Sequence, residues 1–286
     1  MQYHVDGEIV PAEEATVSVR DRGFQYGDGA FETLRAYGGE IFAWDAHADR
    51  LEATAQTLGF AEAIPSRDDL RARIDETVSA NDLDDAYVKL SITRGSQPGK
   101  LTPDPAVDPT IVVLVDSLPR GGVDGQPVWD GPATVATVDT ERVPSAAIPA
   151  GAKTHNYLNG ILARLDLAAD CEEALMLDTQ GYLAEGATSN LCFVADGVLH
   201  TPTSEQSILP GVTRSTVLDL ARAEGLPVEE GRYEPARLRA AEEAFLTNTT
   251  WEIRPVDRVD GQSIGGGPVT QLLARLYDRR VERSCY

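Results

Sequence analysis

The chain has 286 residues, with 25 Lys or Arg against 46 Asp or Glu and a formal net charge of −21. Its length allows one large domain or two modest ones, and either can bury a core. The negative charge argues against nucleic acid or an anionic membrane as a partner. Only three of the basic residues are Lys. An acidic chain so poor in Lys is typical of a high-salt (halophilic) cytoplasm, where surface carboxylates hold water.

The sequence carries no signal for a metal centre, a disulfide framework or a membrane span. Its cysteines, Cys171, Cys192 and Cys285, are few and scattered, and its four histidines are dispersed. The sequence begins without a charged and then apolar leader, and no apolar run approaches the roughly 20 residues that a span needs. We therefore expect a soluble, reduced protein of the cytoplasm that holds no metal.

Residues 1–118 predict a small α+β domain. Turn signals at Asp6-Gly7 and Gly38-Gly39 predict two hairpins. Asp45 is expected to cap a helix that runs through Leu58, and Ser66 is expected to open a second helix in capping-box style. Further strands are expected at 86–93 and 110–115.

Residues 119–127 are rich in Gly and Pro and predict an interdomain linker. Beyond it, strand and helix signals alternate, so residues 128–286 predict a larger α/β domain. Strands are expected at 133–138, 174–177, 191–194 and 198–200, and helices at 156–169, 213–224 and 268–283. The predicted fold class is therefore α/β (α+β), in two domains.

Lys153 is the most informative residue, because the chain has so few lysines. It follows the segment 148–152, Ile-Pro-Ala-Gly-Ala, which contains no acid to pair its amine. A lysine that forms a Schiff base needs a sheltered amine that loses its proton easily. The alternative is a surface lysine on a loop. The scarcity of Lys favours the first interpretation, a lysine that binds a carbonyl cofactor.

Glu185 lies about thirty residues later, in a Gly-rich stretch that ends at Asn190. A carboxylate against a pyridine nitrogen keeps that nitrogen protonated and preserves the ring as an electron sink. Taken alone, Glu185 is more simply a solvated acid in a turn, which Gly186 would also explain. Asn190 could simply order the same turn.

Three segments could bind a phosphate. Gly211-Val-Thr-Arg214 would present backbone N–H groups at the start of a helix, and Thr213 adds a hydroxyl. The segment 247–250, Thr-Asn-Thr-Thr, supplies more donors, and Arg50 could pair with a phosphate. Each signal has an ordinary alternative, a helix cap or an ion pair on the helix of Arg50 itself. Their joint occurrence with Lys153 points to a phosphate-bearing cofactor.

Together these segments resemble the class IV aminotransferase family, the fold type IV pyridoxal-phosphate enzymes. The resemblance covers nearly the whole chain, from residues 21–35 and 47–51 to the segments around Lys153, Glu185, Gly211 and 247–256. It implies a two-domain fold, pyridoxal 5′-phosphate as the cofactor and a small-molecule amino substrate. It also implies a homodimer with its sites between the small N-terminal and the larger C-terminal domain.

Carried across residue by residue, the resemblance implies that Lys153 forms the Schiff base and shuttles the proton. Glu185 would hold the pyridine nitrogen, Tyr157 would lie near the phenolic oxygen, and Asn190 would lie beside them. The implied phosphate ligands are Arg50, the N–H groups of Val212 and Thr213, and Thr249. The implied substrate residues are Tyr26, Phe31, Lys89 and Thr250.

The family member is harder to choose from sequence. The stretches 89–95 and 247–249 look more like 4-amino-4-deoxychorismate lyases, which release 4-aminobenzoate and pyruvate for folate biosynthesis. Branched-chain aminotransferases usually have Gly where this chain has Thr33. The loop 96–105 departs from the lyases, and Gly99 and Leu101 replace the Arg and His of D-amino-acid aminotransferases. The first hypothesis is therefore the lyase, and the alternative is a branched-chain or related transaminase that uses 2-oxoglutarate.

Overall fold

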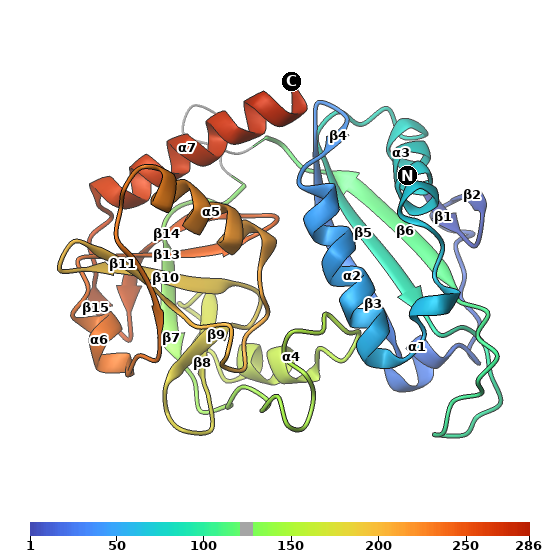
Figure 1. The fold of residues 1–286 in the computed structure, drawn as a ribbon, viewed down its shortest axis with the longest axis horizontal. Helices are drawn as coiled ribbons and strands as arrows, with labels where there is room; N and C mark the ends of the chain where they lie inside the picture. Colours follow the sequence, from blue (N-terminus) through green and yellow to red (C-terminus); the bar gives the residue numbers. More distant parts are fainter. Residues whose placement is uncertain (121–127) are drawn as a thin grey trace. The chain divides into compact units, whose positions relative to one another are not determined.

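The computed structural model describes residues 1–120 and 128–286 and divides into two compact units (Figure 1). Unit 1 comprises Met1–Pro119, Ala152–Asn156 and Ser284–Tyr286, and unit 2 comprises Arg120–Gly151 and Tyr157–Arg283. The sequence predicted two contiguous domains, whereas the structure assigns two short later segments to unit 1. Most of the linker predicted at 119–127 falls outside the described residues.

Unit 1 is built on one antiparallel sheet with the strand order β2-β1-β6-β5-β3-β4. The helices α2 and α3 pack on one face of it (Figure 1), and their apolar side chains share a core with Leu34, Val88 and Val113. The strands of unit 1 are β1 (Gln2–Val5), β2 (Glu8–Pro11), β3 (Gly29–Tyr37), β4 (Glu40–Ile41), β5 (Ala86–Thr93) and β6 (Ile111–Ser117). Its helices are α1 (Arg22–Tyr26), α2 (Trp44–Leu58), the 3-10 turn η1 (Ala61–Ala63) and α3 (Arg67–Ser79).

Both predicted hairpins are confirmed, since β1 pairs with β2 and β3 pairs with β4. Their turns take positive φ angles, 48° and 101° at Asp6 and Gly7, and 55° and 81° at Gly38 and Gly39. Such angles are what a two-residue turn between twisted strands requires. The predicted cap of α3 is also confirmed, because Ser66 Oγ accepts from the Asp69 N–H at 3.2 Å.

The predicted start of α2 was wrong. Asp45 does not cap the helix; the N-cap is Ala43, in a left-handed conformation (φ 53°) without a side-chain hydrogen bond. The chain is constrained just before this point, because the Phe42 N–H donates to the Arg35 carbonyl. Asp45 lies instead in the first turn, where its charge interacts favourably with the helix dipole.

Unit 2 contains a mixed sheet with the strand order β12-β11-β10-β13-β14-β7-β8-β9, and β15 pairs with β14. One side of the sheet packs in a core with Leu191, Phe193 and Leu246. The strands are β7 (Ala133–Thr137), β8 (Glu173–Leu177), β9 (Leu183–Gly186), β10 (Asn190–Ala195), β11 (Val198–Pro202), β12 (Val228–Gly231), β13 (Glu243–Asn248), β14 (Glu252–Val259) and β15 (Gln262–Ser263). The helices are α4 (Leu158–Leu165), α5 (Val212–Ala223), α6 (Pro235–Arg239) and α7 (Pro268–Cys285).

The helix predicted at 156–169 is shorter than expected and spans Leu158–Leu165. Residues before it pair with β3 of unit 1, through an isolated bridge between Ala30 and Thr154. Asn156 is also held by unit 1, because its side-chain Nδ2 donates to the Gly27 carbonyl at 2.9 Å. Tertiary pairing therefore overrides the local helical pattern there. At the other end Asp166 stops the helix, and its carboxylate accepts from the Thr140 N–H at 3.1 Å.

Within residues 1–120 and 128–286, no helix is both long and apolar enough to cross a membrane. The same part of the chain contains no group of three or more His, Cys, Asp or Glu side chains that could hold a metal ion.

Candidate active site

The predicted site residues fall into two sets, one in each unit. Unit 1 contains Tyr26, Phe31, Arg50, Lys89 and Lys153. Unit 2 contains Tyr157, Glu185, Asn190, Val212, Thr213, Thr249 and Thr250.

Lys153 is held as a short extra strand along the start of β3. The Phe31 N–H donates to the Lys153 carbonyl at 3.0 Å, and the His155 N–H donates to the Gly29 carbonyl at 3.0 Å. On its other side, the Lys153 N–H donates to Thr54 Oγ1 on α2 at 3.0 Å. Lys153 is therefore not on a freely exposed loop, and its backbone is fixed by both the sheet and the helix.

The amines of Lys153 and Lys89 both lie near the ring of Phe31. The Lys153 Nζ lies 4.6 Å from the centre of its ring, and the Lys89 Nζ lies 4.8 Å from the same centre. Burial and the nearby charge of Lys153 lower the pKa of Lys89. Lys89 forms no ion pair with an acid of the described residues, which is unusual in a chain with this excess of carboxylates. Each lysine thus places its amine close to the same aromatic ring.

Arg50 is paired, although not with an acid of its own helix. Its Nε and Nη2 donate to the two carboxylate oxygens of Glu32 on β3, at 2.8 and 2.6 Å. His47, one turn earlier on α2, lies with its Nδ1 2.8 Å from the same carboxylate. All three side chains are buried, and Glu32 is completely so.

The charges in this group are strongly coupled. Burial disfavours the charged form of Glu32, but the charge and hydrogen bonds of Arg50, with the hydrogen bond of His47, lower the pKa of Glu32 to about 2. Burial is also the main cause that lowers the pKa of His47. A neutral His47 that donates from Nδ1 to an ionised Glu32 satisfies both effects. Glu32 and His47 were not predicted from the sequence as site residues; an acid inside the apolar strand 29–37 was the available signal.

In unit 2, Glu185 is a buried carboxylate in strand β9, so the alternative of a solvated acid in a turn was wrong. Its Oε1 accepts from Arg142 Nε at 2.7 Å, and its Oε2 accepts from the Leu209 N–H at 2.9 Å. Asn190 Nδ2 donates to the same Oε2 at 3.2 Å and to the Leu209 carbonyl at 2.9 Å. Asn190 therefore ties Glu185 to the turn that precedes α5. Arg142 was missed by the sequence analysis.

The same turn leads directly to the candidate phosphate donors. Gly211 is the N-cap of α5 and makes no side-chain cap hydrogen bond, and Val212 and Thr213 are buried in the first turn. A Cβ on Gly211 would lie 2.0 Å from Asn190 Oδ1, so a larger residue here would force the Asn190 side chain to move. Thr247, which pairs with Asn190 between β13 and β10, has a buried Oγ1 without a hydrogen-bond partner among the described residues.

The remaining predicted residues are less buried. Asn248 orders the turn that contains Thr249, because its Oδ1 accepts from the Thr250 hydroxyl at 3.0 Å and from the Trp251 N–H at 2.7 Å. Tyr157 is the N-cap of α4 and is 36 % exposed. Tyr26, at the end of α1, is 37 % exposed, and the Arg22 guanidinium lies 4.9 Å from the centre of its ring.

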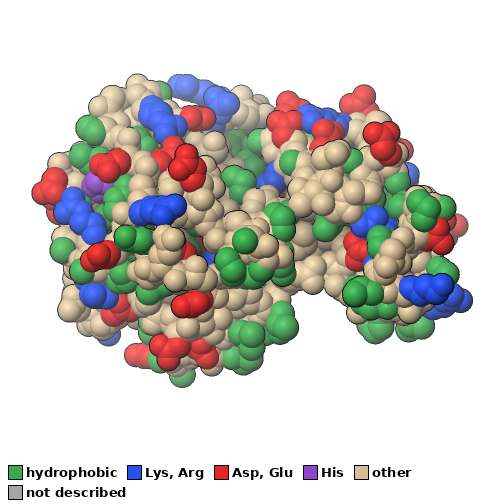
Figure 2. Space-filling model, turned by 60° about the horizontal axis from the view of Figure 1, so that its bottom comes forward, with side chains coloured by type: hydrophobic (Ala, Val, Ile, Leu, Met, Phe, Trp, Pro, Cys, Tyr) green, Lys and Arg blue, Asp and Glu red, His purple; other side chains and the backbone are tan. Residues whose placement is uncertain are grey.

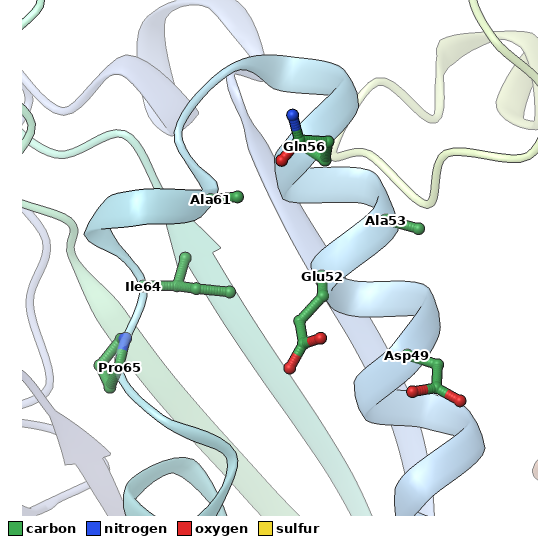
Figure 3. Close-up of a pocket in the computed structure, with 7 residues that line it drawn as sticks. All are labelled: Asp49, Glu52, Ala53, Gln56, Ala61, Ile64 and Pro65. Carbon is green, nitrogen blue, oxygen red and sulfur yellow. The ribbon is translucent and has the colours of Figure 1, made fainter.

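A pocket of unit 1 lies on the exposed side of α2, away from this chemistry. Figure 3 shows it between α2 and the segment around η1. It contains none of the predicted site residues. Its lining residues are Asp49, Glu52, Ala53, Gln56, Ala61, Ile64 and Pro65.

Comparison with known proteins assigns the family. Residues 29–259 match the family described as amino-transferase class IV. The chain belongs to the class IV aminotransferases. Enzymes of this family depend on pyridoxal 5′-phosphate and act as transaminases or lyases, so the expected enzyme class, fold type and cofactor are confirmed.

Individual relatives have different activities. A provisionally named branched-chain-amino-acid aminotransferase of Methanocaldococcus jannaschii is 36 % identical over 281 residues, which is 98 % of this chain and 95 % of that protein. The branched-chain aminotransferase of Thermoproteus uzoniensis, solved with norvaline, has a TM-score of 0.90 and 32 % identity, over 98 % and 94 % of the two chains. The 4-amino-4-deoxychorismate lyase of Pseudomonas aeruginosa has a TM-score of 0.81 and 30 % identity, over 99 % and 100 %.

The residues of this structure fit the cofactor. Pyridoxal 5′-phosphate needs an amine, an acid for its ring nitrogen and donors for its phosphate. Unit 1 offers the amine of Lys153 near the Phe31 ring, and the buried Arg50 on α2. Unit 2 offers a fixed buried carboxylate, joined through Asn190 to an uncapped helix start. The unpartnered hydroxyl of Thr247 lies on the strand that pairs with Asn190, where a polar ligand would satisfy it.

Proposed function

We propose that the enzyme is an amino-acid transaminase for branched-chain or related amino acids, with 2-oxoglutarate as amino acceptor, in which Lys153 is the catalytic residue. The observation that carries the proposal is the group of Lys153, Phe31 and Lys89 on unit 1. It combines the reacting amine with an aromatic surface and a second cation. This order reverses that of the hypotheses from sequence, because the branched-chain aminotransferase of Thermoproteus uzoniensis matches the structure with a higher TM-score than the lyase does, 0.90 against 0.81.

In this proposal the cofactor ligands are those that the resemblance to the family implies. Lys153 would bind it covalently, and Glu185 would hold its ring nitrogen with Asn190 as support and Tyr157 near its phenolic oxygen. The phosphate would accept from Arg50, from the N–H groups of Val212 and Thr213, and from Thr249. The cofactor, when bound, supplies an electron sink for the pair released at the substrate Cα. The freed Lys153 Nζ would then remove and return the proton as general base and acid.

The two substrates of such a transaminase have different side chains. An alkyl side chain would pack on the Phe31 ring, and the resemblance to the family gives Tyr26 and Thr250 as further substrate residues. The second carboxylate of glutamate or 2-oxoglutarate would pair with Lys89, whose ammonium group has no acid partner within the described chain. One site could therefore accept both the alkyl side chain and the second carboxylate, because the Phe31 ring and the Lys89 ammonium group lie next to each other.

The second candidate is 4-amino-4-deoxychorismate lyase. The observation that favours it is the side chain of Thr33, whose hydroxyl is hydrogen-bonded to Tyr87 on the sheet face that carries Lys89. Branched-chain enzymes usually have glycine at this position, so the hydroxyl pair gives this surface a more polar character. A substrate with carboxylates on its ring would also suit Lys89.

A product assay on the cofactor-loaded enzyme in molar salt separates the two reactions. We expect glutamate from leucine and 2-oxoglutarate, and no pyruvate from aminodeoxychorismate when 2-oxo acids are absent. Lys89→Met should raise the KM for 2-oxoglutarate about tenfold, because it removes a charge-assisted contact, and change the KM for leucine less. Catalytic release of 4-aminobenzoate and pyruvate without an acceptor would instead establish the lyase.

We further propose that the enzyme is a homodimer. Four apolar side chains of α4 face solvent, Leu158 (64 % exposed), Ile161 (54 %), Leu162 (45 %) and Leu165 (75 %). Hydrophobic side chains also gather in patches on the face shown in Figure 2. Exposed apolar groups on this scale are typical of an interface, and a second copy would cover them.

Sedimentation should give about twice the chain mass of 30.8 kDa. A native mass of one chain would contradict the proposal, and Leu165→Glu should lower the mass toward that value.

A further inference from the structure

Thr54, in the middle of α2, has a hydroxyl that joins two distant parts of unit 1. The hydroxyl donates to the Arg50 carbonyl at 2.9 Å and accepts from the Lys153 N–H at 3.0 Å. The side chain is only 1 % exposed, so water does not compete for either bond. One hydroxyl therefore links the backbone of the proposed phosphate arginine to the backbone of the proposed catalytic lysine.

Other threonines show what an ordinary helical hydroxyl does. Thr57 on α2 and Thr77 on α3 each donate to the carbonyl four residues earlier, at 2.9 and 2.6 Å. This bond is the common way for Thr to satisfy itself inside a helix. Thr54 makes the same bond and adds the acceptor contact to Lys153. The difference between Thr54 and Thr77, both buried, is thus the contact to the lysine.

The contact completes the fixation of Lys153. Its carbonyl accepts from the Phe31 N–H on β3, and its N–H donates to Thr54 on α2. With both backbone groups held, the Lys153 Cα has a defined place relative to Arg50, and only its side chain is left to swing. Small displacements of a reacting group reduce rates steeply, so this anchoring matters for turnover.

We propose that Thr54 is a positioning residue that sets the place of Lys153 for catalysis. The inference rests on the proposed role of Lys153. The test compares Thr54→Val, which keeps the shape and removes the hydroxyl, with Thr54→Ser, which keeps the hydroxyl. Thr77→Val is the matched control, because it removes a buried helical hydroxyl that has no contact with Lys153.

Two readouts are measured on the cofactor-loaded enzyme. Thr54→Val should lower kcat about tenfold with less than about a threefold change in KM, since positioning and not substrate binding is lost. Hydrogen exchange at the Lys153 backbone amide should become about tenfold faster, because that amide loses its acceptor. Thr54→Ser should restore both to within about twofold of wild type, and Thr77→Val should change neither.

The amide measurement on the wild-type enzyme needs no variant. If the Lys153 amide exchanges as fast as an exposed amide, the contact does not hold the lysine and the inference is overturned. Normal kcat and normal exchange in Thr54→Val would overturn it as well, as would equal losses in Thr77→Val. An active Lys153→Ala variant would instead overturn the proposed function, so the two failures can be told apart.

Discussion

Lys153→Ala should lose turnover by on the order of 10³-fold or more, because the variant has neither the amine that binds the cofactor nor the base that moves the proton. The visible absorption of the covalently bound cofactor should disappear with it. The fold should remain, since the backbone contacts of Lys153 to Phe31 and Thr54 do not involve its side chain. Absorption spectra, steady-state rates and thermal melting of the loaded protein are the measurements.

Because the chain has few lysines, the one that binds the cofactor can be identified directly by labelling. Borohydride reduction followed by peptide mass analysis has only Lys89, Lys100 and Lys153 to distinguish. Lys100→Ala is the control and should behave as wild type. Labelling of Lys89 in place of Lys153, or full activity of Lys153→Ala, would contradict the assignment of the catalytic lysine.

Glu32→Gln should destabilise unit 1 by about 3 kcal/mol, because it leaves the guanidinium of Arg50 buried without its counter-charge. The substitution preserves size, so the loss reflects charge and not packing. Denaturant unfolding in molar salt measures it. Glu52→Gln on α2, the helix of Arg50, is the control: Glu52 pairs with Arg67 at the surface, where solvent screens the charges, so the stability should change little.

The effect of Glu32 should depend on pH in a defined window. Its pKa is lowered from the usual 4.5 to about 2 in the folded protein, so folding favours the ionised form. The stabilisation is fully present above about pH 4.5 and is lost as the pH falls toward about 2. A shift of that size corresponds to roughly 3 kcal/mol, in line with the value expected for Glu32→Gln. The stabilities of variant and wild type should therefore converge at low pH. A constant difference down to pH 2 would show that Glu32 acts through packing.

The sequence predicted local structure best where turn chemistry is strong. The hairpins at Asp6-Gly7 and Gly38-Gly39 and the Ser66 cap follow from residues that favour one backbone conformation. The two helix starts that were wrong depend on tertiary contacts. Ala43 takes a left-handed conformation before α2, and Asn156 is held by Gly27, more than a hundred residues away. No local pattern encodes such contacts.

In the candidate site, too, the sequence indicated some residues, and others became apparent only from tertiary contacts. Lys153, Glu185 and Arg50 were predicted from the order and spacing of the motifs that resemble the family. Their supporting residues were not found, since Glu32, His47 and Arg142 act only through geometry that folding creates. Glu185 illustrates the limit: its environment of Arg142 and Asn190 distinguishes it from a solvated acid, and neither contact is visible in the sequence.

The assignment of Ala152–Asn156 to unit 1 has a consequence for folding and for protein engineering. Met1–Pro119 leave the ribosome before residues 152–156 do, and until that segment follows, the edge of β3 at Gly29–Phe31 lacks its partner segment. An open strand edge can pair with other chains, so a fragment that stops at Pro119 should be prone to aggregate. A rearranged gene that encodes residues 152–156 directly after Pro119 would supply the partner segment of β3 early.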